Sequence, residues 1–284
     1  MSGRKPILLV TGAGGQIGQE LVRMKDAPFE IVGMDRGQLD ITKSAECVAV
    51  IGSLKPDVVV HSAAYTAVDK AESEPEAAWE VNVAGTGNVA KAAESVGAMF
   101  CYISTDYVFN GQGSVPYSEN HETDPQTIYG KTKLEGEKMA ARWSSKLFIV
   151  RTSWVYGKYG HNFVRTMLRI AQSKREISVV NDQLGSPTYT ADLVSKLLEL
   201  IHSELYGTYH ISNSGQCSWF EFAQAIFKEA EVKGVTVFPC TTEQFPRPAP
   251  RPKYSVLGHS ALIQAGFSPL RHWREALRDF MSDA

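Results

Sequence analysis

A phenol and an ammonium group stand four residues apart, at Tyr129 and Lys133. On a helix these two side chains would share one face. Upstream, Ser104 and Thr105 supply two hydroxyl groups at the end of an apolar run. The ammonium can favour the tyrosinate, and a hydroxyl can hydrogen-bond a substrate carbonyl. These residues therefore predict a device that delivers a proton to a ketone, with Thr105, Tyr129 and Lys133 as catalytic candidates.

A tyrosine and a lysine at this spacing are also common on solvated helix surfaces. The position of Ser104 and Thr105 favours the chemical interpretation, because ligands of open α/β sheets gather at the carboxyl ends of the strands. Tyr129 begins a segment that can lean over the same edge. A hydride would have to come from a cofactor.

Glycines cluster directly after the apolar run at residues 7–11, in the sequence Gly-Ala-Gly-Gly-Gln-Ile-Gly. Such a loop lets a pyrophosphate approach the backbone and opens a helix that offers N–H donors. The spacing of Gly12, Gly15 and Gly18 differs from the GxGxxG fingerprint, so the loop alone could be a plain turn. Its strand–loop–helix setting and Asp35, at the end of the next apolar run, favour a dinucleotide site.

The choice of dinucleotide stays open. Asp35 would pair with the hydroxyls of an adenosine ribose and repel a 2′-phosphate, whereas Arg36 beside it could accept that phosphate. The cofactor is therefore NADPH or NADH. Asp40 could flank the adenine, with Ile41; a loop aspartate before a helix that begins at Thr42 is an equal alternative.

Apolar, β-branched runs alternate with amphipathic stretches in the first half of the chain. They predict buried parallel strands at residues 7–11, 30–35, 58–61, 99–104 and 147–152. Helices are expected between them, one at residues 129–142, and Pro75 suits a first helical turn. This pattern predicts an α/β fold, a Rossmann-type doubly wound parallel sheet.

We expect two domains. Residues 1–155 would form an NAD(P)-binding domain, with some later segments packing back on it, and residues 156–284 mainly a smaller α/β substrate domain. In this second half we expect helices at 161–174, 190–203 and 218–231 and strands at 177–180 and 208–211. Five of the 13 prolines fall between Pro239 and Pro252, which predicts an irregular surface loop there.

Composition excludes several classes of partner. The 284 residues are 43 % hydrophobic and 21 % charged with a net charge of -2, which gives no basic field for nucleic acid. The sequence shows neither a signal peptide nor a bilayer-spanning run, so we expect a cytoplasmic protein without a membrane partner. Four scattered cysteines are expected to be reduced.

Longer motifs carry a family resemblance. The glycine loop, Asp35, the segment 104–109 and the Tyr129–Lys133 pair resemble the extended short-chain dehydrogenase/reductases. The segments 67–72, 151–157, 181–188 and 251–257 resemble, more specifically, the dTDP-4-dehydrorhamnose reductase family within that superfamily. The resemblance covers nearly the whole chain.

The resemblance implies reduction at C4 of dTDP-4-dehydro-L-rhamnose to dTDP-L-rhamnose by NADPH or NADH, for surface polysaccharide. It implies catalysis by Thr105, Tyr129 and Lys133, and substrate contacts by Thr105, Asp106 and Trp154. Arg251 would clamp a diphosphate; Trp154 in the core and Arg251 as a solvated charge are the alternatives. The expected cofactor-binding residues are Gly12, Gly15, Gln16, Ile17, Gly18, Asp35, Arg36, Asp40, Ile41, Ala63, Ala64, Tyr65, Tyr129 and Lys133.

Other functions remain open at this point. A nucleotide-sugar epimerase or dehydratase would share the fold and the Tyr/Lys pair. A non-catalytic subunit resembling the regulatory subunit of methionine adenosyltransferase is a further alternative. The resemblance also allows a homodimer with Mg²⁺ at its contact, for which Glu20 and Asp192 are acidic candidates, but their positions show no ligand spacing. We expect surface charge there and leave the metal unknown.

Overall fold

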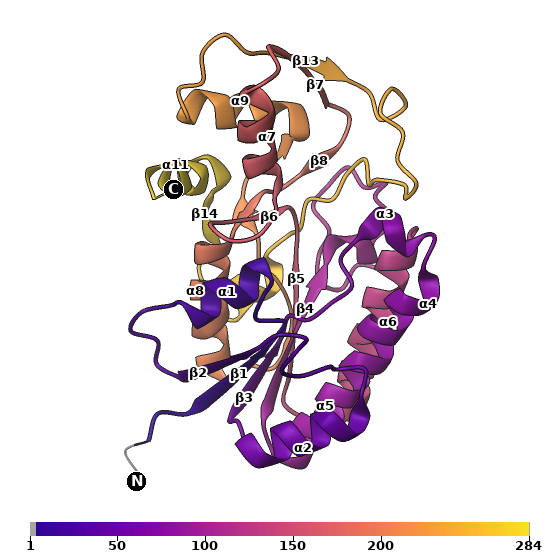
Figure 1. The fold of residues 1–284 in the computed structure, drawn as a ribbon, viewed down its shortest axis with the longest axis vertical. Coiled ribbons are helices and arrows are strands. Elements are labelled where there is room, and N and C mark those ends of the chain that lie inside the picture. Colours follow the sequence, from indigo (N-terminus) through magenta and orange to yellow (C-terminus); the bar gives the residue numbers. More distant parts are fainter. Residues whose placement is uncertain (1–3, 284) are drawn as a thin grey trace.

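The computed structural model describes residues 4–283, and a six-stranded sheet forms its centre (Figure 1). In space the strands follow the order β2 (Glu30–Met34), β1 (Ile7–Thr11), β3 (Val58–His61), β4 (Met99–Thr105), β5 (Leu147–Thr152) and β10 (Gly207–His210). Every neighbouring pair is parallel. The strand order reverses between β1 and β3, which confirms the predicted doubly wound, Rossmann-type sheet.

Helices cover both faces of the sheet because successive residues of a strand point to opposite sides. In β1, Leu8 and Val10 join one buried cluster and Leu9 joins another. Figure 1 shows the two helical layers flanking the strands. One layer comprises α1 (Gln16–Val22), α8 (Thr190–Ser203) and α10 (Ser260–Gln264). The other comprises α2 (Ser44–Leu54), α5 (Thr86–Ser95) and α6 (Ile128–Trp143).

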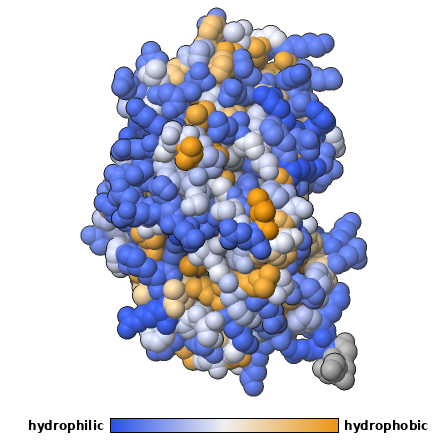
Figure 2. All heavy atoms as spheres, turned by 180° about the vertical axis from the view of Figure 1, so that it is seen from behind, coloured by the Kyte–Doolittle hydropathy of each residue, from blue (hydrophilic) through white to orange (hydrophobic). Residues whose placement is uncertain are grey.

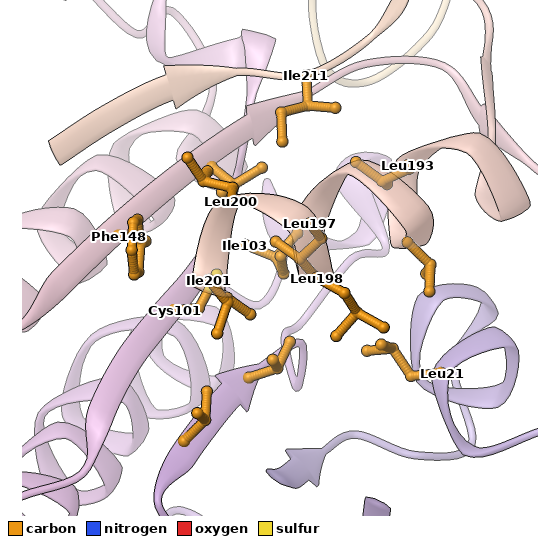
Figure 3. Packing of buried hydrophobic residues seen from close by; sticks show 14 of the residues in the cluster. Leu21, Cys101, Ile103, Phe148, Leu193, Leu197, Leu198, Leu200, Ile201 and Ile211 are labelled. Carbon is orange, nitrogen blue, oxygen red and sulfur yellow. The ribbon is translucent and has the colours of Figure 1, made fainter. Parts of the chain in front are cut away.

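Two elements from late in the chain complete this sheet-based core. Helix α8 packs Leu197 and Ile201 into the same cluster as Cys101 and Ile103 of β4 (Figure 3). Strand β10 extends the sheet beyond β5. Leu197 is fully buried, so its truncation to Ala would cost about 2–5 kcal/mol. The core therefore depends on both halves of the sequence.

A second group of elements surrounds its own buried cluster in the upper part of Figure 1. Its main elements are α7 (Phe163–Ala171), β7 (Glu176–Val180), α9 (Trp219–Glu229), β13 (Thr236–Cys240) and α11 (Trp273–Ser282). Short strands pair as β6 (Val155–Tyr156) with β9 (Thr188–Tyr189), β8 (Leu184–Gly185) with β12 (Cys217–Ser218), and β11 (Asn213–Ser214) with β14 (Leu270–His272). A boundary at residue 155 stays a prediction.

Several local predictions can be compared with the structure. The helix predicted at 129–142 is confirmed as α6, and Pro75 begins α4 (Pro75–Trp79). The helix expected from Thr42 begins at Ser44 instead, because Thr42 donates its N–H and hydroxyl to Asp40 Oδ1, at 3.2 and 2.8 Å. The loop at residues 241–254 contains no helix or strand.

Pro239 departs from the prediction because it lies within β13, which pairs in parallel with β7. Proline is tolerated on a strand at the edge of a sheet, where its missing N–H costs no ladder bond. The remaining elements are short: α3 (Val68–Ala71), the π-helical η1 (Glu80–Gly85) and the 3₁₀-helical η2 (Asp106–Val108).

The surface and the helices bear on the membrane prediction. Seen from behind, the molecule is mostly hydrophilic, and its apolar side chains form small separate groups (Figure 2). Between residues 4 and 283, no helix combines the length and the apolar character needed to cross a bilayer. All four cysteines carry free thiols.

Candidate active site

A cleft of about 800 Å³ opens at the carboxyl ends of the parallel strands. This is the edge where open α/β sheets bind ligands. The predicted residues that line it are Gly12, Gly15, Gln16, Ile17, Gly18, Arg36, Asp40, Ile41, Ala63, Ala64, Tyr65, Thr105, Asp106, Tyr129, Lys133 and Trp154. Two predicted residues, Asp35 and Arg251, lie outside this lining. The cleft therefore brings together the hydroxyl, phenol and ammonium groups with the glycine loop.

The glycine loop packs too tightly for side chains at two positions. At Gly12, which has a φ of +70°, a Cβ would lie 2.6 Å from the backbone of Ala63. At Gly18 a Cβ would lie 2.4 Å from the carbonyl oxygen of Gly12. Gly14 lines the cleft, and a Cβ there would meet no atom within 4 Å. The loop thus presents bare backbone to open space, which fits the pyrophosphate of a dinucleotide.

The residues after β2 bear on the choice of cofactor. Asp35 Oδ1 accepts hydrogen bonds from the N–H groups of Gly37 and Gln38, at 2.8 and 3.2 Å, so this carboxylate stabilises the turn. Arg36 lines the cleft. Of these two adjacent residues, the arginine and not the aspartate therefore lines the cleft.

Helix α6 carries Tyr129 and Lys133 on one face, and its first turn docks against η2. The Thr127 hydroxyl caps the helix by accepting from Gly130 N at 2.9 Å. A Cβ at Gly130 would lie 2.2 Å from the carbonyl oxygen of Tyr107, so only glycine allows this approach. The rings of Tyr107 and Tyr129 meet edge to face at 5.5 Å. The close packing brings the Tyr129 phenol to the end of β4.

Tyr129 has an environment suited to a proton donor. Burial raises its pKa to about 12, and the Asp106 charge adds to this, whereas hydrogen bonding with Thr105 opposes it. The phenol is therefore protonated at neutral pH. In the free protein the side chains that shift the pKa of Tyr129 are Thr105 and Asp106, so the expected action of Lys133 on the tyrosinate stays a prediction.

Lys133 is 2 % exposed, and its ammonium group is held on two sides. Nζ donates to the carbonyl oxygen of Ile103 at 2.7 Å and lies 4.0 Å from the centre of the Tyr102 ring. Burial lowers the pKa of Lys133 to about 7, and the charge of Glu137 opposes that shift. The charge on Lys133 at neutral pH therefore depends on its neighbours.

Asp106 leaves one acceptor atom without a partner. Thr105 Oγ1 donates to Asp106 Oδ1 at 3.0 Å, but the buried Oδ2 has no hydrogen bond. Burial raises the pKa of Asp106 to about 6, and the nearby hydroxyl groups of Ser255 and Thr105 oppose the shift. Thr152 Oγ1, on the neighbouring strand end, is also buried and unpartnered. Unsatisfied polar atoms in a cleft fit hydroxyl groups of a ligand.

Trp154 lines the cleft in a strained conformation, with a φ of +48°. Its ring stacks on that of Trp219, with 3.4 Å between centroids and 6° between planes. The indole also packs closely against Gly185, where a Cβ would be 2.4 Å away. Sequence reasoning missed Trp219, because α9 is remote in the chain and an aromatic residue at a helix start carries no distinctive signal.

Asn82 is a second residue that sequence reasoning missed. Its Oδ1 accepts from Tyr65 N at 2.8 Å, and its Nδ2 donates to Thr132 Oγ1 at 2.9 Å. Asn82 lies in η1, and it thus links the loop after β3 to α6. Only the fold brings these three segments together, so no local pattern indicated it.

Arg251 lies in an ion pair with Asp69, at 2.8 Å, and also donates to the carbonyl oxygen of Ala249. Asp69 belongs to α3 and Arg251 to the irregular loop at 241–254. The pair therefore joins that loop to the sheet-bearing part of the molecule. Its proposed role as a diphosphate clamp stays a prediction.

The acidic candidates for a metal have other partners. Glu20 Oε2 accepts from the Thr190 hydroxyl at 2.7 Å, and Asp192 accepts two hydrogen bonds from Arg271, at 2.8 and 2.9 Å. Across the part of the chain that the structure describes, no three His, Cys, Asp or Glu side chains form a potential metal site. These contacts favour the structural role for both carboxylates.

Comparison with known proteins now decides the family. Residues 6–284 match the family model described as the RmlD substrate binding domain. The chain belongs to this RmlD family. It is 47 % identical to the spore coat polysaccharide biosynthesis protein SpsK of Bacillus subtilis, over 97 % of each chain. It is 43 % identical to a dTDP-4-dehydrorhamnose reductase of Streptomyces griseus, over 97 % of this chain and 93 % of the relative.

A solved structure supports membership of the RmlD family. The dTDP-4-dehydrorhamnose reductase of Bacillus anthracis, in complex with NADP, superimposes with a TM-score of 0.96 and 47 % identity. The match covers 99 % of this chain and all of the other, 100 %. The family resemblance carried by the sequence motifs is thereby confirmed, and the whole RmlD chain has the fold of an NADP-bound reductase.

Proposed function

We propose that this protein reduces the C4 ketone of dTDP-4-dehydro-L-rhamnose to the alcohol of dTDP-L-rhamnose, with NADPH as the reductant. The observation that carries the proposal is a protonated, half-buried Tyr129 beside Thr105 in the cleft that also contains the glycine loop. Relatives with the dTDP-4-dehydrorhamnose reductase name support the choice of substrate.

The chain's own groups supply the proton and hold the ketone. When bound, the reduced nicotinamide supplies the hydride that adds to C4. Tyr129 donates its proton to the ketone oxygen as negative charge develops there. The Thr105 hydroxyl, which donates to Asp106 Oδ1 in the free protein, rotates to donate to the same ketone oxygen. The tyrosinate that results lies on the same helical face as Lys133, whose positive charge stabilises it until solvent restores the proton. The substrate gains one hydride and one proton.

Two further groups would orient the sugar. The free Oδ2 of Asp106 accepts a hydrogen bond from a sugar hydroxyl, which satisfies a buried acceptor. Trp154, backed by Trp219, offers a flat apolar wall to the deoxy carbon. A cleft of about 800 Å³ has room for these contacts beside a dinucleotide.

NADPH is favoured over NADH by the residues after β2. Asp35 is engaged with the backbone of its own turn, whereas Arg36 faces the cleft and can pair with a 2′-phosphate. We expect Arg36→Ala to lower kcat/KM for NADPH about tenfold or more and to leave that for NADH almost unchanged. Equal losses with both cofactors would contradict this assignment.

The proposed reaction can be tested directly. Purified protein mixed with dTDP-4-dehydro-L-rhamnose should consume NADPH in equal amount, as followed by nicotinamide absorbance. An epimerase would regenerate its cofactor, so stoichiometric oxidation separates the two activities. Tyr129→Phe should bind NADPH but turn over at least about 100-fold more slowly. A folded wild-type protein that binds NADPH and leaves the keto sugar unchanged would refute the proposal.

We extend the proposal to organisation and location. Residues 1–155 would carry mainly the cofactor, residues 156–284 mainly the nucleotide sugar, and the enzyme would act in the cytoplasm, alone or as a homodimer. Cell fractionation and light scattering of the purified protein test the last two points.

A further inference from the structure

A buried ion pair lies directly behind the catalytic face of α6. Arg151 of β5 donates two hydrogen bonds to Glu137, from Nε to Oε1 at 2.9 Å and from Nη2 to Oε2 at 2.7 Å. Ser104 of β4 donates a third, at 2.5 Å, to Oε1. The two charged side chains are only 7 % and 5 % exposed. Burying such a pair costs desolvation energy, so its position calls for a physical reason.

Ser104, Arg151 and Glu137 each adjoin a residue that lines the cleft. Ser104 precedes Thr105, Arg151 precedes Thr152, and Glu137 follows Lys133 by one helical turn. Residues four apart on a helix are neighbours. The Glu137 carboxylate therefore supplies a negative charge one turn from Lys133, which raises the pKa of the lysine without forming a salt bridge to it, and its three donated hydrogen bonds fix where that charge lies.

We propose that Glu137 is a positioning residue that keeps the Lys133 ammonium charged in its buried place, and that Arg151 and Ser104 set the strength and orientation of this effect. The inference rests on the proposed function, because it assigns Lys133 its role there. With Glu137 removed, the positive charge of Arg151 would face Lys133 uncompensated. With Arg151 removed, the negative charge of Glu137 would be uncompensated instead.

Other titratable groups around Lys133 have different states at neutral pH. His61 of β3 is neutral, since burial lowers its pKa to about 3. Tyr102 of β4 and Tyr129 are neutral because burial raises their pKa values. Asp106 of η2, with a pKa of about 6, is ionised above neutrality. The titration of Lys133 therefore has to span about pH 5 to 9, a range in which Asp106 also titrates but does so in every variant, so that only the ion pair differs between variants.

The test compares Glu137→Gln with Arg151→Met, because both break the same ion pair. The Lys133 side chain is titrated by NMR in the cofactor-free protein with ε-¹³C-labelled lysine, and Lys133→Met identifies its signal. Glu137→Gln should lower the midpoint by about one pH unit, and Arg151→Met should raise it by about one. The pH above which turnover declines should be correspondingly lower in Glu137→Gln and higher in Arg151→Met than in the wild type. If the ion pair had a purely structural role, both variants would lose the same stability and would not shift the Lys133 midpoint in opposite directions.

Two outcomes overturn the inference: shifts in the same direction, or an unmoved Lys133. If one of the single variants does not fold, the double variant Glu137→Gln/Arg151→Met is compared with the single variant that folds. Its Lys133 midpoint has to lie closer to the wild-type value. Because the titration needs no turnover, the result also separates this inference from the proposed reaction. An inactive wild-type protein with opposite NMR shifts would refute the reaction alone.

Discussion

Replacing Asp106 by Asn should stabilise the protein at neutral pH and not in acid. Burial raises the pKa of this carboxyl from 3.8 to about 6. The folded protein therefore binds a proton more tightly than the unfolded chain, and its stability falls as the pH rises from about 4 to 6. A shift of about two pKa units corresponds to about 3 kcal/mol at pH 7.5. Asn keeps the shape and the hydrogen bond from Thr105 without the charge.

Urea unfolding of both proteins at pH 7.5 and pH 3.5 measures this difference. We expect Asp106→Asn to be more stable by about 2–3 kcal/mol at pH 7.5, with the difference vanishing at pH 3.5, where both side chains are neutral. Asp124→Asn, at an exposed site, is the control and should follow wild type at both pH values. A difference that is the same at both pH values would refute the reasoning. Activity with the sugar should fall, because the amide NH₂ group of Asn, a donor, takes the place of the unpartnered acceptor Oδ2.

Three further predictions concern packing, two of them near the cleft and one at a control position in α2. Trp219→Ala should raise KM for the sugar nucleotide several-fold with little change in kcat, and circular dichroism should lose the exciton signal of the Trp154–Trp219 stack; an unchanged spectrum would contradict the stacking. Gly130→Ala should destabilise by about 1–3 kcal/mol, because its Cβ would press on the backbone of Tyr107. Gly52→Ala, in a helix with open space around it, should instead stabilise by up to about 1 kcal/mol, as thermal unfolding would show.

Local signals made much of the fold predictable. Strands such as β1 read as short apolar runs, and α6 reads as a stretch of good helix formers, because these preferences act over a few residues. Gly12 and Gly18 occur where the packed backbone has no room for a Cβ. Because only glycine fits such positions, the glycine cluster after a strand identified the loop from the sequence. The catalytic candidates could be predicted because Thr105 lies at a strand end and because Tyr129 and Lys133, four residues apart, share one face of a helix.

Tertiary partners could not be read from the sequence. Asp35 and Arg36 are adjacent, and which one faces the cleft depends on the turn that Asp35 itself stabilises. The shared position of Glu137 and Arg151, and the support that Trp219 gives Trp154, require contacts between elements that are distant in the chain. Burial also shifts pKa values in ways that spacing does not reveal: it raises the pKa of Tyr129 to about 12, whereas the pair with Lys133 suggested a lowered one.

Strand β10 has a consequence for synthesis on the ribosome. The edge of β5 that faces away from β4 has no partner strand until about residue 210 has left the exit tunnel. Until α8 has also been made, one face of the sheet is not covered by this helix. Translation proceeds from the N-terminus, so the glycine loop is made long before its supporting core is complete. The nascent first half must wait for the second, and evolution cannot easily exchange either half on its own.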